Sequence, residues 1–238
     1  MRLDNYLYEN GYTNSRNKAK ELILNKKVLV NNNIITKASF NISNNEECNI
    51  KILQASIYVS RAGDKLKAFF LENPVQIKNK QCLDIGSSTG GFVQVLLEYG
   101  AKKVVAVDVG TDQLDQSLRI DKRVECNEQT DIRNYKKDGC FDIVTCDVSF
   151  VGIEYIIQDI DRLSCRDIII LFKPQFEVGK EVKRNKKGVV KNQSAITLAQ
   201  KKFEALCHTL KWHLCDKRAS KVHGKEGNLE FFYYYTKR

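Results

Sequence analysis

Residues 81–108 constrain the fold of this chain more than any other stretch. A short apolar run, Gln81-Cys-Leu-Asp-Ile85, leads into a glycine-rich turn and then into an apolar helical pattern at 92–99. A second apolar run at 103–108 ends in Asp108. A strand, a glycine-rich turn, a helix and a strand with a terminal acid are typical of a βαβ unit that binds a ligand at the turn. The stretch therefore predicts an α/β sheet with a binding site at the ends of its first strands.

The turn departs from the dinucleotide fingerprint G-x-G-x-x-G, because Ser88 takes the place of the second glycine. That glycine lets the backbone approach a pyrophosphate. Its replacement favours a nucleoside ligand without phosphates, and S-adenosylmethionine is the obvious one. The alternative is an ordinary strand–turn–helix without a ligand.

Residues 1–53 predict a small separate unit. Helical patterns cover 2–7 and 16–24, the second capped at Thr13-Asn-Ser15, and strand patterns cover 28–30, 34–35 and 50–53. The residues Arg2-Leu3-Asp4, Ser15-Arg16, Ala19, Ile23 and Val28-Leu29-Val30-Asn31 resemble the core of the S4 RNA-binding domain, although Lys26-Lys27 stand where that family often has a glycine. A generic basic α/β unit is the alternative. Clustered cations suit phosphate contacts, and the expected RNA-binding residues are Arg2, Arg16, Lys18, Lys20, Lys26 and Lys27.

The rest of the chain predicts a linker at 54–59 and a larger domain at 60–238. Ser60 is expected to cap a helix over 60–71 that stops before Pro74. From residue 81 strands and helices alternate, which favours a mostly parallel sheet with helices on both faces. We place strands at 81–85, 103–108, 123–126, 141–147 and 167–172, and helices at 91–99, 112–118, 152–163 and 193–209. Two last strands, 212–220 and 229–236, form an antiparallel hairpin, as in the Rossmann-like sheet of S-adenosylmethionine-dependent methyltransferases.

Overall charge and cysteine usage narrow the class of protein. A net charge of +10 favours a polyanionic partner. The eight cysteines form no C-x-x-C motif, and several, such as Cys82 and Cys146, lie in apolar strand patterns. We therefore expect buried, reduced thiols in the cytoplasm, with no disulfide and no zinc site. The N-terminus is polar and no long apolar run occurs, so we expect no signal peptide and no membrane span. The three histidines, His208, His213 and His223, lack the spacing of metal ligands, so we expect no metal. We also expect a monomer.

Four charged residues interrupt or end apolar patterns. Asp147 and Lys173 each end a predicted strand, Glu230 lies inside the last one, and Lys65 lies on the helix that opens the domain. The carboxyl ends of the central strands of a doubly wound sheet meet at one crevice. We expect the four side chains to gather there. Two structural ion pairs at the rim of the sheet are the alternative.

Several motifs carry a family resemblance. They are Ser60-Arg-Ala-Gly-Asp-Lys-Leu66, Asp84-Ile-Gly-Ser-Ser-Thr-Gly-Gly-Phe92, Asp108-Val-Gly110, Asp147-Val-Ser-Phe150, Lys173-Pro-Gln-Phe-Glu-Val-Gly179 and Gly227-Asn-Leu-Glu230. The larger domain resembles the FtsJ-type ribose 2′-O-methyltransferases, which use a Lys-Asp-Lys-Glu tetrad. With the S4-like unit, the whole chain resembles the TlyA (hemolysin A) family of rRNA 2′-O-methyltransferases. The resemblance maps the tetrad onto Lys65, Asp147, Lys173 and Glu230, with Lys67 as the rival of Lys65.

The resemblance implies roles for these residues. Lys173, flanked by Asp147 and Lys65, would orient the ribose hydroxyl and act partly as a base. Glu230 would position Lys65 or the ribose. The loop 86–91 would hold the methionine end of the cofactor, Asp108 its ribose, and the region of Thr130-Asp131 its adenine. The expected cofactor-binding residues are Asp84, Gly86, Ser87, Ser88, Gly90, Gly91, Phe92, Asp108, Val109, Thr130, Asp131 and Asp147.

The resemblance also implies a substrate, the 2′-hydroxyl of a cytidine in ribosomal RNA. Shorter family members modify only a large-subunit site, and the start at Arg2-Leu3-Asp4 resembles the short form. The basic stretch 173–191 is expected to be a lid that grips RNA, with a solvated loop as the alternative. Its expected contacts, with one residue of the opening helix, are Arg61, Lys183, Arg184, Lys186 and Lys187.

Other activities remain open at this point. Amino-group methyltransferases usually carry [DN]-P-P-[FYW] after the fourth strand, which Asp147-Val-Ser-Phe150 does not match. A C5-cytosine enzyme needs a thiol, and strand alternation points Cys146 away from the site. A membrane-active haemolysin and a binding protein without catalysis are the alternatives from other classes.

Overall fold

The computed structural model describes residues 1–13, 15–42, 48–52 and 58–237. The chain forms two compact units, Met1–Ile57 and Tyr58–Arg238. Most of the predicted linker 54–59 lies outside the described residues. Its last two residues belong to the larger unit. The Tyr58 hydroxyl donates to Glu98 at 2.5 Å, and the Val59 amide donates to Gln94 at 2.8 Å.

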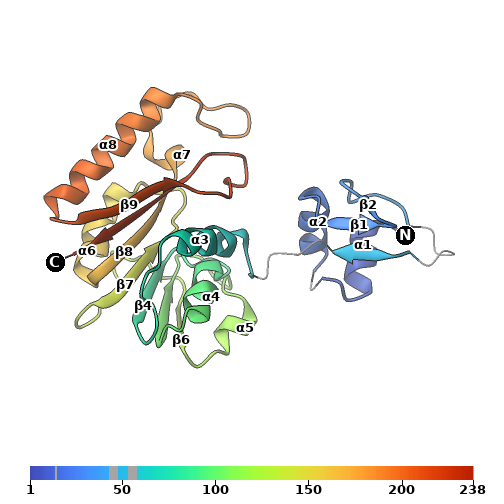
Figure 1. The fold of residues 1–238 in the computed structure, drawn as a ribbon, viewed down its shortest axis with the longest axis horizontal. Helices are drawn as coiled ribbons and strands as arrows, with labels where there is room; N and C mark the ends of the chain where they lie inside the picture. The colour runs from blue at the N-terminus through green and yellow to red at the C-terminus, as the bar shows by residue number, and fades with distance from the viewer. Residues whose placement is uncertain (14, 43–47, 53–57, 238) are drawn as a thin grey trace. The chain divides into compact units, whose positions relative to one another are not determined.

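The N-terminal unit packs two helices on a small sheet. Helices α1 (Leu3–Glu9) and α2 (Arg16–Leu24) precede strands β1 (Val28–Val30), β2 (Asn33–Ile34) and β3 (Ile50–Ile52), which pair antiparallel in the order β2-β1-β3 (Figure 1). The Ser15 hydroxyl accepts from the Lys18 amide at 3.2 Å, so the predicted cap of α2 is confirmed. Apolar residues at helical spacing, among them Leu3, Leu7, Ala19 and Ile23, are fully buried. The end of the predicted strand 50–53 lies outside the described residues.

The larger unit is built on a seven-stranded sheet in the order β6-β5-β4-β7-β8-β10-β9. Strands β4 to β8 run parallel, and β10 runs antiparallel to both of its neighbours. The Rossmann-like sheet with a terminal antiparallel hairpin is therefore confirmed. The strands are β4 (Gln81–Ile85), β5 (Lys103–Val107), β6 (Val124–Asn127), β7 (Phe141–Cys146), β8 (Ser164–Phe172), β9 (His213–Ala219) and β10 (Phe231–Thr236).

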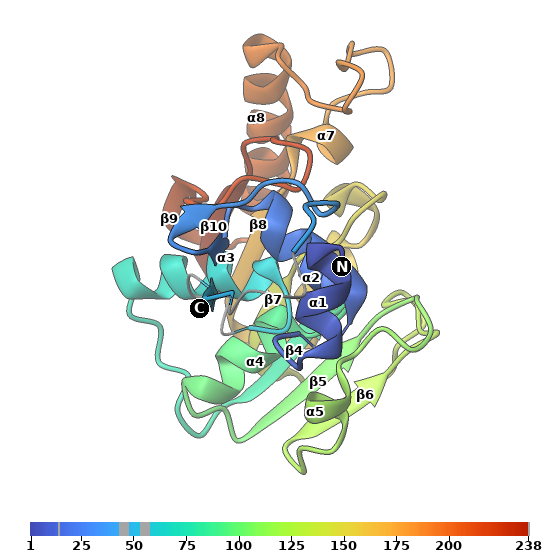
Figure 2. The ribbon, with the colours of Figure 1, turned by 90° about the vertical axis from the view of Figure 1, so that its right-hand side faces the viewer.

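Helices cover both faces of this sheet (Figures 1 and 2). Side chains of α3 (Arg61–Glu72) and α4 (Gly91–Glu98) form one core with one set of strand residues, and those of α6 (Ile157–Leu163) and α8 (Gln193–Thr209) form the other. Neighbouring strand residues alternate between the two cores, as Val104 and Val105 do, because successive side chains of a strand point to opposite faces. The short elements α5 (Gln116–Arg119), η1 (Ile153–Tyr155) and α7 (Pro174–Glu177) lie in the connections.

Several predicted boundaries were wrong. The predicted helix 112–118 is the short α5, because Glu128 accepts from the amides of Asp112, Gln113 and Leu114 and holds them in a loop. The predicted helix 152–163 divides into η1 and α6, and β8 begins at Ser164. Helix α3 begins after Ser60, whose side chain makes no capping hydrogen bond. None of the described helices is both long and apolar enough to cross a membrane.

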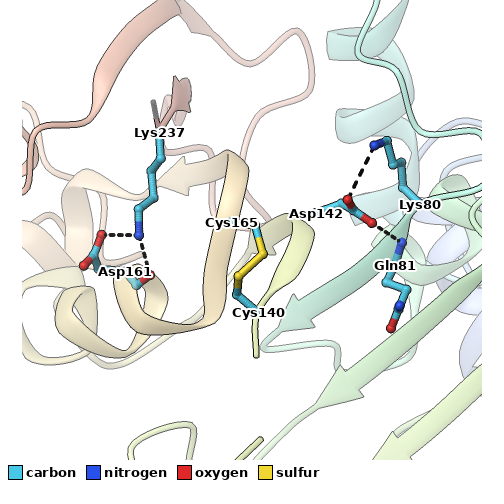
Figure 3. The surroundings of a disulfide bond; sticks show 7 residues. All are labelled: Lys80, Gln81, Cys140, Asp142, Asp161, Cys165 and Lys237. Atoms are coloured by element: carbon cyan, nitrogen blue, oxygen red, sulfur yellow. Dashed lines mark hydrogen bonds and ion pairs between the residues drawn. A yellow bond between two sulfur atoms is a disulfide. The ribbon is translucent and has the colours of Figure 1, made fainter. Parts of the chain in front are cut away.

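The expectation that all cysteines are thiols was wrong. Cys140 and Cys165 form a disulfide with a Cα–Cα distance of 5.3 Å (Figure 3). Phe141 pairs with Ser164 in the parallel ladder, so Cys140, just before β7, and Cys165, near the start of β8, lie at the same end of the sheet. Sequence spacing cannot show this proximity. Cys82, Cys146 and Cys207 are buried thiols as predicted, whereas Cys215 is exposed.

Candidate active site

A pocket of about 460 Å³ opens where β4, β5 and β7 end. Its size is in the range of small-molecule sites. Gly86 follows β4 with φ +77°, and a Cβ on it would lie 3.0 Å from the backbone oxygen of Asp147. A glycine is therefore needed there for both the backbone conformation and the close approach of the β7 end. The pocket is lined by Ile85, Gly86, Ser88, Val107, Asp108, Val109, Thr130, Asp131, Ile132, Arg133, Asp147, Val148, Ser149, Phe150, Val151 and Ile156.

Asp108 closes β5 and organises the loops around it. Its carboxylate accepts from the backbone amides of Ser88 and Gly110, both at 2.7 Å. Ser88 has φ +46°, so the residue at the second glycine position of the fingerprint adopts a left-handed conformation. The carboxylate of Asp108 lines the pocket and is half-buried, which suits the two hydroxyls of a ribose.

Asp84 is a buried acid behind the pocket wall. One oxygen accepts from the Thr145 hydroxyl at 2.7 Å, and among the described residues the other has no hydrogen-bond partner. Burial raises the pKa of Asp84 to about 7, the Thr145 hydrogen bond opposes the shift, and the charges of Asp147 and Asp108 add to it. A buried, unpartnered acceptor at the end of the first strand is suited to a cationic group of a ligand.

The pocket gathers only part of the predicted cofactor set. Gly86, Ser88, Asp108, Val109, Thr130, Asp131 and Asp147 line it, whereas Asp84, Ser87, Gly90, Gly91 and Phe92 do not. Gly91 and Phe92 contribute to core packing instead. Phe92 is 2% exposed and stacks on Phe232, and a Cβ on Gly91 would collide with the side chain of Ser60.

Sequence reasoning missed the segment after β7, which forms one wall of the pocket. Phe150 has φ +66° and is 91% exposed, and its ring lies 5.1 Å from that of Phe176. The Glu177 carboxylate accepts from the Ile153 amide at 3.2 Å and holds the end of the segment. An exposed ring at a pocket is suited to stacking on a nucleic-acid base. A bulky residue with positive φ is unusual, but a sequence does not reveal φ.

The four interrupting charges lie together beside the pocket. Lys65 Nζ donates to Glu230 Oε2 at 2.6 Å, and Lys173 Nζ lies 2.7 Å from Asp147 Oδ1. Asp147 and Lys173 follow β7 and β8 directly, Lys65 lies on α3, and Glu230 precedes β10 rather than lying inside it. All four side chains are at most 12% exposed. We call this group the tetrad.

Asp147 is the electrostatic centre of the tetrad. Burial raises its pKa above the usual range, and the charges of Lys173 and Lys65 oppose that shift. The contact of Asp147 Oδ1 with Lys173 is an ion pair without the angles of a hydrogen bond. Lys173 instead donates to the Ser149 hydroxyl at 2.8 Å. Opposite charges at these distances offset the desolvation of buried ions.

The rival lysine and the candidate thiol both lie elsewhere. Lys67 pairs with Glu98 at 2.5 Å and its ammonium lies over the Tyr99 ring, so it faces α4 instead of the tetrad. Cys146 is buried in the core under α6 and α8, and burial raises its thiol pKa. A cysteine nucleophile at this site is therefore unsupported. Within the described ranges, no group of three or more His, Cys, Asp or Glu side chains is placed to hold a metal ion.

The predicted RNA-binding residues differ in their exposure and in whether their charged groups form ion pairs. In the N-terminal unit Lys26 and Lys27 are exposed, and Lys18 and Lys20 are half-buried. Arg2 and Arg16 pair with buried Asp4 at 2.9 and 3.1 Å, and the hydrogen bond from Arg2 lowers the pKa of Asp4 to about 2. The two arginine side chains are 44% and 45% exposed, so they remain accessible to a phosphate.

In the larger unit the basic segment forms the loop between α7 and α8 (Figure 2). Lys183, Lys186 and Lys187 are exposed on it. Arg184 is half-buried and donates to the backbone oxygens of Gln175, Val178, Gly179 and Val182 at 2.8–3.4 Å. Arg61 donates to the His223 backbone oxygen at 2.8 Å. The two arginines are therefore already engaged with the backbone, which their sequence context does not reveal.

Comparisons with known proteins agree with this geometry. Residues 58–237 match the FtsJ-like methyltransferase family, and residues 1–48 match the S4 domain. The 23S rRNA (cytidine-2′-O)-methyltransferase TlyA of Campylobacter jejuni is 49% identical over 241 residues, which cover 94% of this chain and 94% of the relative. The 16S/23S rRNA (cytidine-2′-O)-methyltransferase TlyA of Mycobacterium tuberculosis is 35% identical, with 97% and 88% covered. A solved structure of a hemolysin from Streptococcus thermophilus has a TM-score of 0.76 and 30% identity, with 100% and 88% covered.

Proposed function

This chain belongs to the TlyA (hemolysin A) family of S-adenosylmethionine-dependent rRNA 2′-O-methyltransferases, and on that premise we propose that it methylates a cytidine ribose of large-subunit rRNA. The observation that carries the proposal is the double position of Asp147. Asp147 is one of the residues that line the pocket of about 460 Å³, and its carboxylate pairs with Lys173 of the tetrad. A methyl donor in the pocket and a ribose at the tetrad would therefore meet at one residue.

The residues around the pocket fit the cofactor. Asp108 would bind its ribose, the Gly86–Ser88 backbone and Asp84 its methionine end, and Thr130 with Ile132 its adenine. When bound, S-adenosylmethionine supplies an electrophilic methyl group, whose bond to sulfur breaks as its bond to the ribose oxygen forms, with the electron pair returning to sulfur. Every other task falls to side chains of this chain.

The tetrad is suited to a weakly acidic hydroxyl. We assign to Lys173 the positioning of the 2′-hydroxyl, because its side-chain nitrogen lies between Asp147 and Ser149. As the neutral amine, Lys173 would accept the hydroxyl proton and become the ammonium. The positive charge of Lys65 would stabilise the developing alkoxide, and Glu230 would keep Lys65 in place. Fixed alignment of the two substrates would supply much of the acceleration.

Two surfaces would bind the RNA. The S4 unit would contact it through Arg2, Arg16, Lys18, Lys20, Lys26 and Lys27. The larger unit would contact it through Lys183, Lys186 and Lys187, with Phe150 beside the target base. We further propose that the protein acts as a cytoplasmic monomer on a ribosomal subunit, the large one by similarity to the Campylobacter jejuni relative.

Separated ribosomal subunits test the substrate. Each is incubated with the protein and labelled S-adenosylmethionine, with Lys173→Ala as the inactive control. We expect label on large-subunit rRNA that is lost with the variant. Label on the small subunit alone would contradict the choice of subunit, and no label on any RNA would contradict the proposed activity.

A further inference from the structure

The Glu230 carboxylate has a separate partner on each oxygen. Oε2 accepts from Lys65 at 2.6 Å, and Oε1 accepts from the side-chain amide of Gln175 at 3.2 Å. Glu230 is 2% exposed, so water cannot replace either partner easily. Two donors on two oxygens fix the rotation of the carboxylate. The orientation in which the Glu230 carboxylate accepts from Lys65 therefore depends on Gln175.

Gln175 lies two residues after Lys173, on the first turn of α7. This short helix thus begins directly after one tetrad residue, Lys173, and carries the amide that holds another, Glu230. A helix of this length leaves most of its backbone oxygens without partners of its own. Arg184 provides a donor for two oxygens of this segment, because its guanidinium donates to the backbone oxygens of Gln175 at 3.0 Å and Val178 at 3.2 Å.

Gly224 lies close to the same carboxylate oxygen. A Cβ on Gly224 would lie 2.6 Å from Glu230 Oε1. The oxygen that accepts from the Gln175 amide therefore has no room for a side chain at position 224.

We propose that Gln175 is a positioning residue that orients Glu230 toward Lys65, with Arg184 fixing the backbone of Gln175. The inference rests on the proposed function of the tetrad. Replacing the amide by an apolar group leaves a buried carboxylate oxygen unpaired. Glu230 then turns to recover a partner, Lys65 moves with it, and the charge at the reacting oxygen is less well stabilised.

Steady-state kinetics with large ribosomal subunits test this. Gln175→Leu removes the donor, and Gln193→Leu on the exposed start of α8 is the matched control. We expect kcat to fall about tenfold with Gln175→Leu, while the Kd for S-adenosylmethionine stays within about twofold. An unchanged kcat, or a rise in Km alone, would overturn the proposal.

A double-mutant cycle asks whether Gln175 acts through Glu230. In a Glu230→Gln background, Gln175→Leu should lower kcat by less than about threefold further. A full tenfold loss in that background would overturn the inference but leave the proposed function intact. Normal activity of Glu230→Gln itself would overturn both the inference and the role assigned to Glu230 in the tetrad, while methyl transfer itself would still be observed.

Gly224→Ala is a second variant for the case that Gln175→Leu folds poorly. It places a methyl group against the Glu230 carboxylate and leaves Gln175 unchanged. Its added methyl group should displace Oε1 from the amide and lower kcat about tenfold with cofactor affinity unchanged. Full activity of a folded Gly224→Ala would show that the orientation of Glu230 does not matter, and would overturn the proposal.

Discussion

Lys65 and Glu230 are 165 residues apart in the chain, yet their side chains meet at 2.6 Å inside the larger unit. Lys65 lies on α3, before the first strand of the sheet, and Glu230 precedes β10, the last strand. The pair therefore joins both ends of the fold beside the Asp147–Lys173 pair. The tetrad therefore depends on the tertiary fold of the larger unit.

The two lysines of α3 should differ sharply in their effect on methyl transfer. Lys65→Ala removes the cation that pairs with the buried Glu230 carboxylate, and we expect kcat to fall roughly 10²–10⁴-fold. Lys67→Ala breaks a pair with the half-exposed Glu98, and we expect activity within about twofold. Initial rates on ribosomal subunits measure both. Equal losses in the two variants would mean that the tetrad has been assigned to the wrong lysine.

Asp108 should control cofactor affinity. Asp108→Ala removes the carboxylate that binds the ribose and frees the Ser88 and Gly110 amides, so we expect the Kd for S-adenosylmethionine to rise at least about tenfold. Asp138→Ala, at an exposed acid away from the pocket, is the control. Isothermal titration calorimetry measures both. The same affinity in both variants would place the ribose elsewhere.

Asp84 should make stability depend on pH. Its folded pKa of about 7 lies above the ordinary value for an aspartate, so the folded state binds the proton more tightly. The contribution of Asp84 to the free energy of unfolding is fully present below about pH 4 and is lost as pH rises to about 7. Asp84→Asn does not titrate, so its Tm relative to the unaltered protein should rise between pH 5 and pH 8. A difference in Tm that stays constant over this range would contradict the raised pKa.

The exposed lysines of the loop between α7 and α8 should contribute to RNA affinity through charge alone. Lys186→Ala with Lys187→Ala should weaken binding and lower the slope of log K against log salt by roughly 1.5. Lys201→Ala with Lys202→Ala, on the exposed side of α8, is a control matched in charge. Binding of ribosomal RNA at several salt concentrations measures the slopes. Identical slopes for the two double variants would exclude the loop from the RNA contact.

The disulfide should matter for stability and not for catalysis. Cys140 and Cys165 lie where β7 and β8 begin (Figure 3). Asp147 and Lys173 follow the opposite ends of these strands. Closing a loop of 25 residues is worth about 2–4 kcal/mol. We expect a reductant to lower Tm by several degrees while methyl transfer stays unchanged. An unchanged Tm together with lost activity would contradict this.

The sequence predicted the parts of the site that follow from strand order. Asp147 and Lys173 could be placed because strands β7 and β8 are apolar and adjacent, and a charge after each must lie at the same edge of the sheet. Lys65 and Glu230 could be singled out as charges in apolar patterns, but their pairing could not be predicted from the residues alone, since neither periodicity nor spacing relates a residue of α3 to one that precedes β10.

The missed features depend on side-chain geometry. Gln175 and Ser149 are ordinary polar residues in the sequence, and only the folded chain shows that they donate to Glu230 and accept from Lys173. Arg184 was grouped with its neighbouring lysines because a sequence gives charge and not partners. The disulfide was missed because the register of β7 against β8 decides which cysteines meet.

The most direct measurement of the central claim is the chemical position of the methyl group. Large-subunit rRNA treated with the protein is digested to nucleosides and analysed by mass spectrometry, beside RNA treated with Lys173→Ala. The account predicts 2′-O-methylcytidine from the unaltered protein and none above background from the variant. A methyl group on a base, or 2′-O-methylcytidine formed equally well by Lys173→Ala, would contradict it.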